Sequence, residues 1–494
     1  MLTLRSGSGK WVVAATVLGS GVAALGATVV NIALPAIGRD LDADLADLQW
    51  VTTSYVLTLS AFLLLGGALG DRYGRRRVFL IGVVWFAVAS VLCAFAASSG
   101  QLIAARAVQG VGAALLTPGS LAILQASFAP GDRPKAIGAW SGLGGLATAG
   151  GPVLGGWLID VASWRWVFLV NLPMAAATVL ITVRHVPESR DEARAARGGP
   201  IDAPGAALAV VWLGALALAL IGAPSRGWTS PATLGLLAVA VVGFLGFLAV
   251  ERRAWDPMLP LEVFHEPRFS SINAVTFVVY GALTGGLFLL PILLQVGAGY
   301  SPLQAGLATL PITAIMLVGS APSGALAARI GPKLQLSIGP VFVGLGLFML
   351  RDAGNGSYVT ALLPALVVHG IGLALTVAPL TAVALDAAPP EHAGVASAVN
   401  NNVARAAGLV AVAVLPGIVG LDAESFTTGA GLADGFRLAM DLCALGCAAG
   451  GLLAALTIHN RLETAPEVPA FHCAVEGPPP CATEPADRPV TTHR

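Results

Sequence analysis

The sequence predicts an all-α polytopic membrane protein with 14 transmembrane helices, arranged as two pseudo-symmetric six-helix bundles plus two inserted helices. The 494 residues are 56% hydrophobic and only 11% charged, whereas soluble domains carry about 25% charged residues. The apolar residues form runs of roughly 20 residues, the length that crosses a bilayer as a helix. A short motif also recurs in the two halves of the chain.

Windows of about 19 residues place the helices in order along the chain. The first six apolar runs lie near 12–34, 50–70, 78–97, 102–125, 136–159 and 166–183. Two more runs, near 203–222 and 231–250, stand between two hydrophilic stretches. The last six runs lie near 271–296, 303–328, 335–350, 358–385, 393–420 and 435–458.

These runs divide the chain into consecutive segments. They are a cytoplasmic N-terminus (1–11), an N-terminal six-helix bundle (12–183), a cytoplasmic linker (184–202), two inserted transmembrane helices (203–250), a second cytoplasmic linker (251–270), a C-terminal six-helix bundle (271–458) and a disordered cytoplasmic tail (459–494). The tail is rich in Pro and polar residues, which do not support a packed core. We expect the inserted helices to pack beside the bundles and not to line a cavity, because their apolar runs contain no charged residue.

The basic residues set the predicted orientation. Most of the 27 Lys and Arg residues fall in alternate loops, with a dense cluster at 72–77. Short cytoplasmic loops are enriched in Lys and Arg, so both termini are predicted to be cytoplasmic. Lys occurs only at positions 10, 135 and 333, which together with the high Ala and Gly content indicates a GC-rich bacterial genome. The predicted location is therefore the bacterial cytoplasmic membrane.

An internal repeat relates the two bundles. The segment GALGDRYGRR begins at Gly67, and GALAARIGPK begins at Gly324. Both copies fall in the loop after the second helix of their half, so chance similarity of Gly-rich and Ala-rich text is the weaker explanation. Parallel six-helix repeats are a known transporter architecture, with the substrate site between the halves.

Several classes of protein are not indicated. The formal net charge is +0, so no nucleic-acid partner is expected. The five Cys residues lack metal-site spacing, and the chain contains no G-x-x-x-x-G-K-[ST] loop for a nucleotide. We therefore expect no metal site and no enzyme.

The loop after the second predicted helix holds an acid among cations. One interpretation is topological, with basic side chains anchoring the loop at the membrane surface. The other is a charge lock, in which Asp71 pairs with arginines and with the N-terminal end of a neighbouring helix. The residues assigned a gating role in this loop are Gly67, Gly70, Asp71, Arg72, Gly74, Arg75 and Arg76.

Arg106 stands inside the otherwise apolar fourth helix. A charge at that depth is unfavourable, so such residues normally face a cavity or a partner. Gln109 lies three residues later, on the same helix face. The alternative is a structural hydrogen bond from Arg106 to a buried carbonyl.

Two further helices carry unusual patterns. The fifth helix is rich in Gly and contains Pro152; small residues permit close packing of helices, and a Pro bends the axis. Ordinary packing or a pivot between the halves both fit this pattern, and the pivot candidates are Gly151, Pro152, Gly155 and Gly156. The thirteenth helix has a polar stripe at Ser397, Asn401 and Arg405, which cannot face lipid without a large penalty.

These motifs resemble the major facilitator superfamily, and within it the fourteen-helix drug:proton antiporter family of the multidrug efflux type. The resemblance covers most of the membrane part of the chain. The similar segments are the loop 2-3 signature at Gly67–Arg77, the helix 4 signature at Arg106–Gly110, the antiporter signature at Gly151–Gly156, and two segments typical of the fourteen-helix branch, Trp164–Pro173 and Gly299–Leu307.

The resemblance implies a secondary active transporter that exports drug-like or amphipathic small molecules by proton antiport with alternating access. Asp71 and its cations would stabilise the outward-open state, and Arg106 would be linked to proton transfer. The implied partners are an amphipathic small molecule, protons and the lipid bilayer, with a monomeric chain and no cofactor beyond the proton gradient. The residues expected to line the substrate cavity are Thr28, Asn31, Trp50, Tyr55, Gln109, Tyr280, Gln295, Asn401 and Arg405.

One position departs from this family. The family's first-helix signature places an Asp where this chain has Gly26, so proton coupling through that helix is in question. Asp441 is a possible substitute, together with His369, and these two join Arg106 as proton-coupling candidates. For Asp441 the alternative is a structural ion pair with Arg437, one turn earlier; for His369 it is an interior hydrogen bond. Weakly coupled transport is the third possibility.

Two other functions stay open on the sequence. A dedicated exporter of one endogenous metabolite or antibiotic would share all of these motifs. A non-transporting membrane receptor would share the helices but would show no flux.

Overall fold

The computed structural model describes residues 2–4, 6–129, 132–190, 202–254, 257–259, 261–354, 357–387, 393–421, 425 and 431–460. The described residues are helical apart from loops and one isolated bridge between Leu2 and Phe128. The predicted tail lies outside the described residues from position 461 onward.

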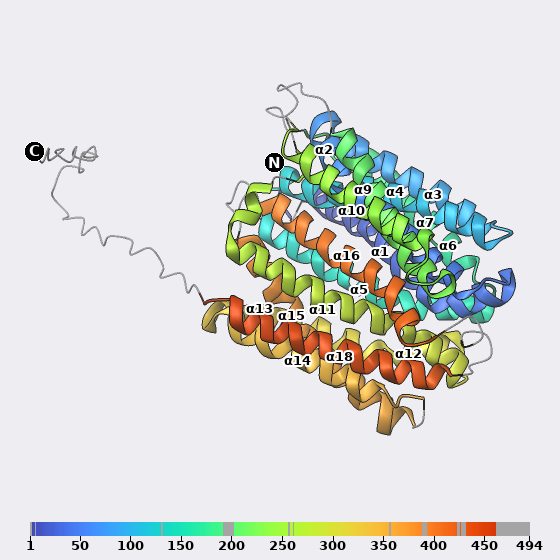
Figure 1. Ribbon diagram of the computed structural model, residues 1–494. Coiled ribbons are helices and arrows are strands. Elements are labelled where there is room, and N and C mark those ends of the chain that lie inside the picture. Colours follow the sequence, from blue (N-terminus) through green and yellow to red (C-terminus); the bar gives the residue numbers. More distant parts are fainter. Residues whose placement is uncertain are drawn as a thin grey trace, which may run out of the picture. The chain divides into compact units, whose positions relative to one another are not determined.

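The first bundle is built from seven helical segments (Figure 1). They are α1 (Gly7–Leu41), α2 (Leu45–Tyr73), α3 (Arg75–Ala94), α4 (Ser99–Ser127), α5 (Arg133–Val161), the short α6 (Trp166–Leu169) and α7 (Asn171–His185). Ser or Asp residues begin three of them, because their side-chain oxygens accept from a free backbone N–H in the first turn. These N-terminal caps are Ser6, Asp44 and Ser98.

The remaining helices follow in two groups. The inserted pair is α9 (Ala203–Arg226) and α10 (Pro231–Glu251). The second bundle comprises η1 (Leu261–His265), α11 (Pro267–Ile292), η2 (Leu293–Gly297), α12 (Pro302–Ala308), α13 (Leu310–Ile330), α14 (Pro332–Leu350), η3 (Tyr358–Leu362), α15 (Leu363–Asp386), α16 (Ala393–Ile418) and α18 (Leu432–Thr457).

The described residues contain 13 helices that are long and apolar enough to cross a membrane. The helix α5, with 29 residues, makes a fourteenth of spanning length, since about 20 residues suffice. The prediction of an all-α protein with 14 membrane helices is confirmed. The division of the chain into segments stays a prediction at its boundaries.

Two opposite faces of the protein are useful as references. The Gly74 face carries the turn between α2 and α3 at Gly74, and the Asp42 face carries the turn between α1 and α2 at Asp42. Helices that begin on one face end on the other, because each spans the bundle once.

The internal repeat is visible in the backbone. Gly74, between α2 and α3, has φ 111°, and Gly331, at the corresponding place between α13 and α14, has φ 85°. Side chains other than Gly rarely adopt positive φ. The repeated motif therefore encodes the same sharp turn in both bundles.

The apolar core is shared between the bundles on one face and divided on the other. Towards the Asp42 face, a single cluster joins residues of the first bundle, such as Leu34 and Phe168, to residues of the second, such as Phe288 and Phe436. Towards the Gly74 face, the first bundle has its own cluster and the second has a separate one. The two bundles are thus closed against each other on the Asp42 face.

The inserted pair packs beside this arrangement. Leu213 of α9 lies in a cluster with Leu57 of α2 and Leu409 of α16. In Figure 1 the green α9 and α10 cover one side of the bundles, next to α2 and α16. Contact with both bundles agrees with the prediction that these helices lie beside the halves.

Candidate functional site

Arg106 is fully buried in the N-terminal third of α4 and is held by neighbouring helices. Its Nε donates to the Val51 carbonyl at 3.0 Å, and its Nη1 donates to the Gly26 carbonyl at 3.0 Å and to Gln109 Oε1 at 2.6 Å. The guanidinium carbon lies 4.2 Å from the centre of the Tyr55 ring. No carboxylate is among these partners. The Nη2 atom has no hydrogen-bond partner among the described residues.

Gln109 links Arg106 to α3. Its Nε2 donates to Ser90 Oγ at 2.8 Å, while its Oε1 accepts from Arg106. The i to i+3 spacing in the sequence predicted that these two side chains share a face, and the hydrogen bond between them agrees. Gln109 is also fully buried, so it fixes the orientation of the arginine.

Arg405 belongs to the second bundle and stands on α16. This helix packs against α2, which carries Tyr55. Arg405 is half-buried, and its Nε has no hydrogen-bond partner among the described residues. Three of the predicted site residues, Tyr55, Arg106 and Arg405, therefore stand on α2, α4 and α16, and α2 packs against both of the other helices.

Gly26 occupies the position where the resembled family has an acid. Its carbonyl accepts the hydrogen bond from Arg106. A Cβ atom built at this glycine would lie 2.8 Å from Phe86 Cζ, closer than real Cβ contacts. The first helix therefore contacts Arg106 through its backbone, and a side chain at this position requires the Phe86 ring to move.

The predicted gating loop forms a charged cluster within the first bundle. Arg75 Nε donates to Asp71 Oδ1 at 2.9 Å. The backbone N–H of Arg76, at the start of α3, donates to Glu188 Oε1 at 3.0 Å, and its Nη2 donates to the Val183 carbonyl at 2.8 Å. The carboxylate at this helix start is thus Glu188, which the sequence interpretation did not single out.

The second bundle repeats this capping with a different residue. Asn460, just after α18, accepts from the backbone N–H of Lys333 at 3.0 Å. Lys333 stands at the start of α14, as Arg76 stands at the start of α3. In each bundle, the chain that leaves the last helix returns to cap the third one.

The glycines of α5 divide between two neighbours. A Cβ at Gly155 would lie 2.6 Å from Val29 on α1, within the first bundle. A Cβ at Gly156 would lie 2.7 Å from Leu303 on α12, in the second bundle, and α12 approaches with Gly306 against the carbonyl of Pro152. The motif that predicted close packing or a pivot therefore forms a backbone-to-backbone crossing between the bundles.

Three side chains also bridge the bundles near the Asp42 face. Gln49 Nε2 donates to the Val412 carbonyl at 2.7 Å, and Gln295 Nε2 donates to the Ile32 carbonyl at 3.0 Å. Asp160 Oδ2 accepts from Ser301 Oγ at 2.8 Å and from the Leu303 N–H at 3.2 Å. We call Gln49, Gln295 and Asp160 the latch. Of these only Gln295 was predicted as a site residue, because single polar residues at helix ends are unremarkable in sequence.

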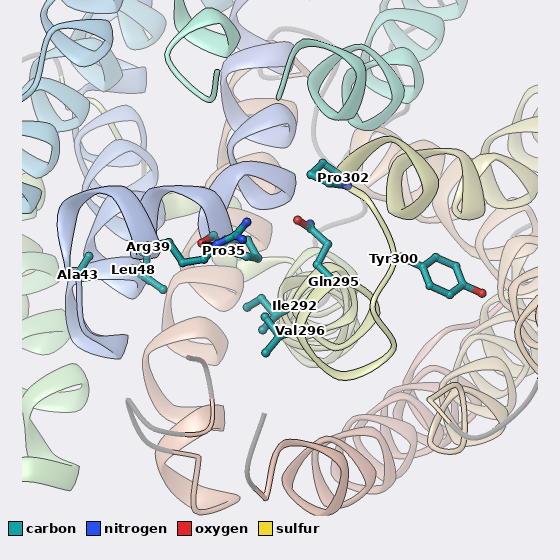
Figure 2. Close-up of a pocket in the computed structure, with 10 residues that line it drawn as sticks. Pro35, Arg39, Ala43, Leu48, Ile292, Gln295, Val296, Tyr300 and Pro302 are labelled. Atoms are coloured by element: carbon teal, nitrogen blue, oxygen red, sulfur yellow. Dashed lines mark hydrogen bonds between the residues drawn. The ribbon is translucent and has the colours of Figure 1, made fainter. Parts of the chain in front are cut away.

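A pocket of about 330 Å³ opens beside the latch (Figure 2). Arg39 and Leu48 line it from the first bundle, and Gln295 and Tyr300 line it from the second. Gln295 Oε1 is buried without a hydrogen-bond partner among the described residues. The pocket thus lies at the seam between the bundles.

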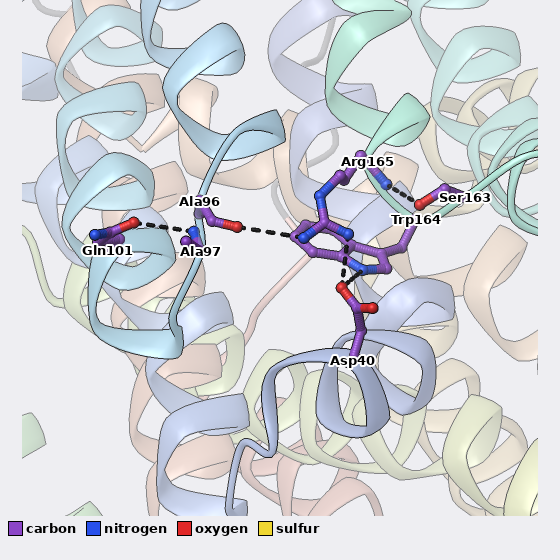
Figure 3. A network of polar contacts seen from close by, with 7 residues as sticks. All are labelled: Asp40, Ala96, Ala97, Gln101, Ser163, Trp164 and Arg165. Atoms are coloured by element: carbon purple, nitrogen blue, oxygen red, sulfur yellow. Dashed lines mark hydrogen bonds and ion pairs between the residues drawn. The ribbon is translucent and has the colours of Figure 1, made fainter.

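Asp40 fastens the turn between α5 and α6 to the end of α1 (Figure 3). Its Oδ2 accepts from Arg165 Nη1 at 2.6 Å and from Trp164 Nε1 at 3.0 Å. Arg165 Nη2 reaches the Ala96 carbonyl at 3.5 Å. The Trp-Arg pair that marks the fourteen-helix branch therefore stabilises the first bundle itself.

The two other proton-coupling candidates have structural partners. Asp441 pairs with Arg351 at 3.3 Å, and not with Arg437 as the sequence interpretation supposed; Arg437 pairs with Asp352 at 3.1 Å. His369 is fully buried, with Nδ1 3.3 Å from the Val343 carbonyl and Nε2 without a partner among the described residues. Neither residue contacts the Arg106 cluster in the contacts of the described residues.

The remaining cavity candidates do not form one constellation. Thr28 bonds back to its own helix, and Asn401 Nδ2 donates to the Ser397 carbonyl at 2.9 Å. Trp50 packs with the inserted helices, and Tyr280 packs with the separate core of the second bundle. The last of these candidates is Asn31, whose Oδ1 is buried without a hydrogen-bond partner among the described residues.

Two pseudo-symmetric bundles that close on one face around buried arginines define a transport protein of the membrane. Residues 16–413 match the family model of the Major Facilitator Superfamily. The chain belongs to this superfamily.

Its relatives are exporters and resistance proteins. The chain is 37% identical over 407 residues to the tetracenomycin C resistance and export protein of Streptomyces glaucescens, covering 81% of this chain and 74% of the relative. It is 39% identical over 386 residues to the multidrug resistance protein Stp of Mycobacterium tuberculosis, covering 78% and 71%. It is 35% identical over 432 residues to the methylenomycin A resistance protein of Bacillus subtilis, covering 87% and 91%.

Solved structures share the fold at low sequence identity. A peptide transporter of the POT family in complex with sulfate has a TM-score of 0.66 at 15% identity, covering 92% of this chain and 96% of that chain. A D-xylose–proton symporter has a TM-score of 0.63 at 15% identity, covering 91% and 98%. The chain is thus a multi-pass membrane transporter of the bacterial drug and antibiotic exporter type within the superfamily.

Proposed function

We propose that this chain exports amphipathic small molecules from the bacterial cytoplasm by alternating access, with the Gly74 face in the cytoplasm. The single observation that carries the mechanism is the apolar core, which joins the bundles on the Asp42 face and divides on the Gly74 face. Basic residues cluster in the loops of the Gly74 face, as in cytoplasmic loops. The structure then corresponds to the inward-facing state, in which substrate enters from the cytoplasm.

The electrochemical proton gradient is the proposed energy source, with its electrical component dominant and only loose coupling to the pH difference. A proton antiporter needs a group that loads and releases a proton within the membrane. In the first helix, the position where the family has an acid is Gly26, whose backbone carbonyl binds Arg106. Asp441 forms an ion pair with Arg351. We expect a pH gradient to drive export less steeply than in relatives that have an acid in the first helix.

Accumulation of fluorescent dyes in a host lacking its own exporters tests this function. Expression of the chain should lower dye accumulation, and Arg106→Ala at equal membrane levels should abolish the effect, because a buried side chain that bonds to the backbones of α1 and α2 is lost. Arg77→Gln serves as the control, since Arg77 is an exposed cation in the first turn of α3, and exposed ion pairs contribute only about 0–1 kcal/mol. Normal export by Arg106→Ala would contradict the mechanism, and absence of any flux in proteoliposomes would favour the receptor alternative.

The dedicated exporter of one metabolite or antibiotic is the second candidate. It is favoured by the names of two relatives, which refer to single antibiotics, tetracenomycin C and methylenomycin A. Unchanged accumulation of every dye, combined with secretion of one compound by the native host, would support it.

A further inference from the structure

The helix interiors carry cations without an acid at the same depth. Arg106 and Arg405 lie inside predicted membrane runs. In the described helices the acids stand in the first or last turns, with Asp441 as the exception. Asp441 is 3.3 Å from Arg351 at the Asp42 face, so it does not neutralise the two interior arginines.

Both of these arginines have unused hydrogen-bond donors. Arg106 Nη2 and Arg405 Nε are both buried and lack partners among the described residues. The Arg106 guanidinium carbon lies 4.2 Å from the centre of the Tyr55 ring, and Arg405 stands on α16, which packs against α2, the helix of Tyr55. Arg106 is partly compensated by the carbonyls of Gly26 and Val51, which supply dipoles but no negative charge.

Uncompensated positive charge in a membrane interior is unfavourable unless a partner supplies the opposite charge. The planar guanidinium matches carboxylates and related oxyanions through paired N–H donors. A cationic molecule at Tyr55 would be attracted by the aromatic ring but repelled by both arginines. Repulsion between like charges therefore selects against cationic substrates. An anion placed between the two arginines would satisfy both charges and both unused donors.

We propose that the substrate of this exporter is an organic anion, an aromatic carboxylate, sulfonate or phenolate, bound between Arg106 and Arg405 beside Tyr55. This inference rests on the proposed export function and names its substrate class. Bacterial cytoplasm is electrically negative relative to the outside, so the outward movement of an anion is driven by the membrane potential itself. Charge balance then requires no proton-binding carboxylate in the first helix, which accounts for Gly26 at that position.

Two xanthene dyes of opposite charge test the proposal in proteoliposomes. Fluorescein is an anion at pH 7.5, and rhodamine 123 is a cation on the same tricyclic scaffold. We expect fluorescein to move at least about tenfold faster than rhodamine 123. A tenfold potassium gradient with valinomycin, oriented to push anions out of the compartment, should concentrate fluorescein about tenfold or more outside, because charge movement through a potential sets the limiting ratio.

Variants at Arg405 link the preference to the site. Arg405 is only half-buried, so its replacement is less disruptive than that of Arg106. Arg405→Gln should lower fluorescein flux about tenfold without lowering rhodamine 123 flux, and Arg405→Lys should keep the preference for the anion. Arg437→Gln is the matched control, because Arg437 pairs with Asp352 at the Asp42 face and should leave both rates unchanged.

The possible outcomes distinguish failure of the anion proposal from failure of the proposed export function. Faster movement of rhodamine 123, or fluorescein flux that follows a pH gradient and ignores the potential, overturns the anion proposal while leaving export intact. Fluorescein flux that is equal in wild type and Arg405→Gln overturns the assigned site. Movement of neither dye counts against the export of amphipathic dyes itself, and the anion proposal fails with it.

A second observation, independent of the first, concerns two buried acids at the Gly74 face. Asp202 caps α9 and Glu251 ends α10, with 7% and 3% of their surfaces exposed. Asp202 Oδ1 accepts from the Gly205 N–H at 2.8 Å, and Glu251 Oε2 accepts from the Leu259 N–H at 3.0 Å. The two residues stand at the same end of the packed helices α9 and α10, and Asp202 Oδ2 and Glu251 Oε1 lack any N–H or O–H donor among the described residues.

Two ionised carboxylates are both acceptors, so a hydrogen bond between them requires one shared proton. No described cation is a partner of this pair. Arg252 and Arg253, which follow Glu251, are exposed; the segment 257–259 has no ionisable side chain; and α2 and α16 contact α9 through apolar residues such as Ala61 and Leu409. We infer that Asp202 and Glu251 form a proton-binding site. This site connects the inserted pair, α9 and α10, to Leu259 in the segment that precedes α11.

Infrared difference spectra of the purified protein test this site. Raising the pH should remove one carboxylic acid C=O band in wild type, and both Glu251→Gln and Asp202→Asn should lack that band. Thermal stability of wild type should fall as the pair loses its proton at rising pH, because two negative charges then face each other, and Glu251→Gln should flatten this dependence. Glu262→Gln, at an exposed acid of the adjacent η1, should keep both the band and the pH dependence. A band that survives both variants, or a pH dependence that Glu251→Gln leaves unchanged, overturns the assignment.

Discussion

Gly26 shows how one residue sets the chemistry of the interior. Its carbonyl binds Arg106, and the Phe86 ring fills the space where a side chain would begin. An Asp side chain therefore cannot be introduced at position 26 without a change in packing, because the Phe86 ring packs against the glycine.

Gly26→Asp should destabilise the protein unless Phe86 is also reduced. The new Cβ would lie 2.8 Å from Phe86 Cζ, and overpacking of this kind costs roughly 1–3 kcal/mol. The double variant Gly26→Asp with Phe86→Leu should recover stability and should show steeper export with a pH gradient, since it places an acid near Arg106. Thermal unfolding and flux across a pH step measure the two effects.

Gly26→Ala is the control for this pair, because it adds the Cβ without the charge. It should match the stability loss of Gly26→Asp and gain no pH dependence. A single Gly26→Asp variant of wild-type stability would contradict the packing argument.

At the scale of helices, the crossing of α5 and α12 joins the two bundles. Gly156 and Gly306 let backbone meet backbone, and Asp160 accepts from the Leu303 N–H in the first turn of α12 and from the Ser301 hydroxyl that precedes it. Charge at a helix start is favourable because the free N–H groups and the helix dipole attract an anion. Packing and electrostatics therefore act at the same crossing.

Gly156→Ala should block closure on the Asp42 face and reduce transport about tenfold or more. Its Cβ would lie 2.7 Å from the Leu303 Cα atom, a backbone contact that no side-chain rotation relieves. Gly150→Ala is the matched control on the same helix, since nothing lies within 4 Å of a Cβ there. Equal transport by the two variants, at equal membrane levels, would rule out a functional role for the crossing.

The sequence predicted both sides of the crossing between α5 and α12 but not their contact. The glycines of α5 and the segment Gly299–Leu307 were both recognised as motifs, yet only their structure shows that they contact each other. Asp160 and Gln49 escaped notice because one acid or amide at a helix end has no pattern. Pairing across more than 100 residues is a property of the fold, which local periodicity does not encode.

At the scale of the whole molecule, the helix count and the repeat followed from hydropathy and from one motif. Apolar length is decided locally, so 14 helices could be predicted without any knowledge of their neighbours. The state of the molecule could not, since both states of a transporter share one sequence. Asp441 illustrates the same limit, because its neighbour at i−4 indicated Arg437, whereas the fold supplies Arg351 from α14.

The latch should set the balance between the two states of the transporter. Gln49, Gln295 and Asp160 bond across the bundles on the Asp42 face, and each hydrogen bond contributes about 0.5–1.5 kcal/mol net. Loss of about 1 kcal/mol shifts a two-state equilibrium roughly fivefold. Gln49→Ala and Asp160→Ala should therefore each raise the outward-facing population about fivefold, and together they should raise it about 25-fold if the sites are independent.

Distances between spin labels on opposite bundles at the Asp42 face measure these populations. Asp44→Ala is a suitable control, because Asp44 caps α2 within the first bundle and makes no bridge to the second among the contacts of the described residues. It should leave the distance distribution unchanged while slightly lowering stability. An unchanged distribution in the Gln49 and Asp160 double variant would show that apolar packing alone holds the Asp42 face closed, and the latch would then be a consequence of closure and not its cause.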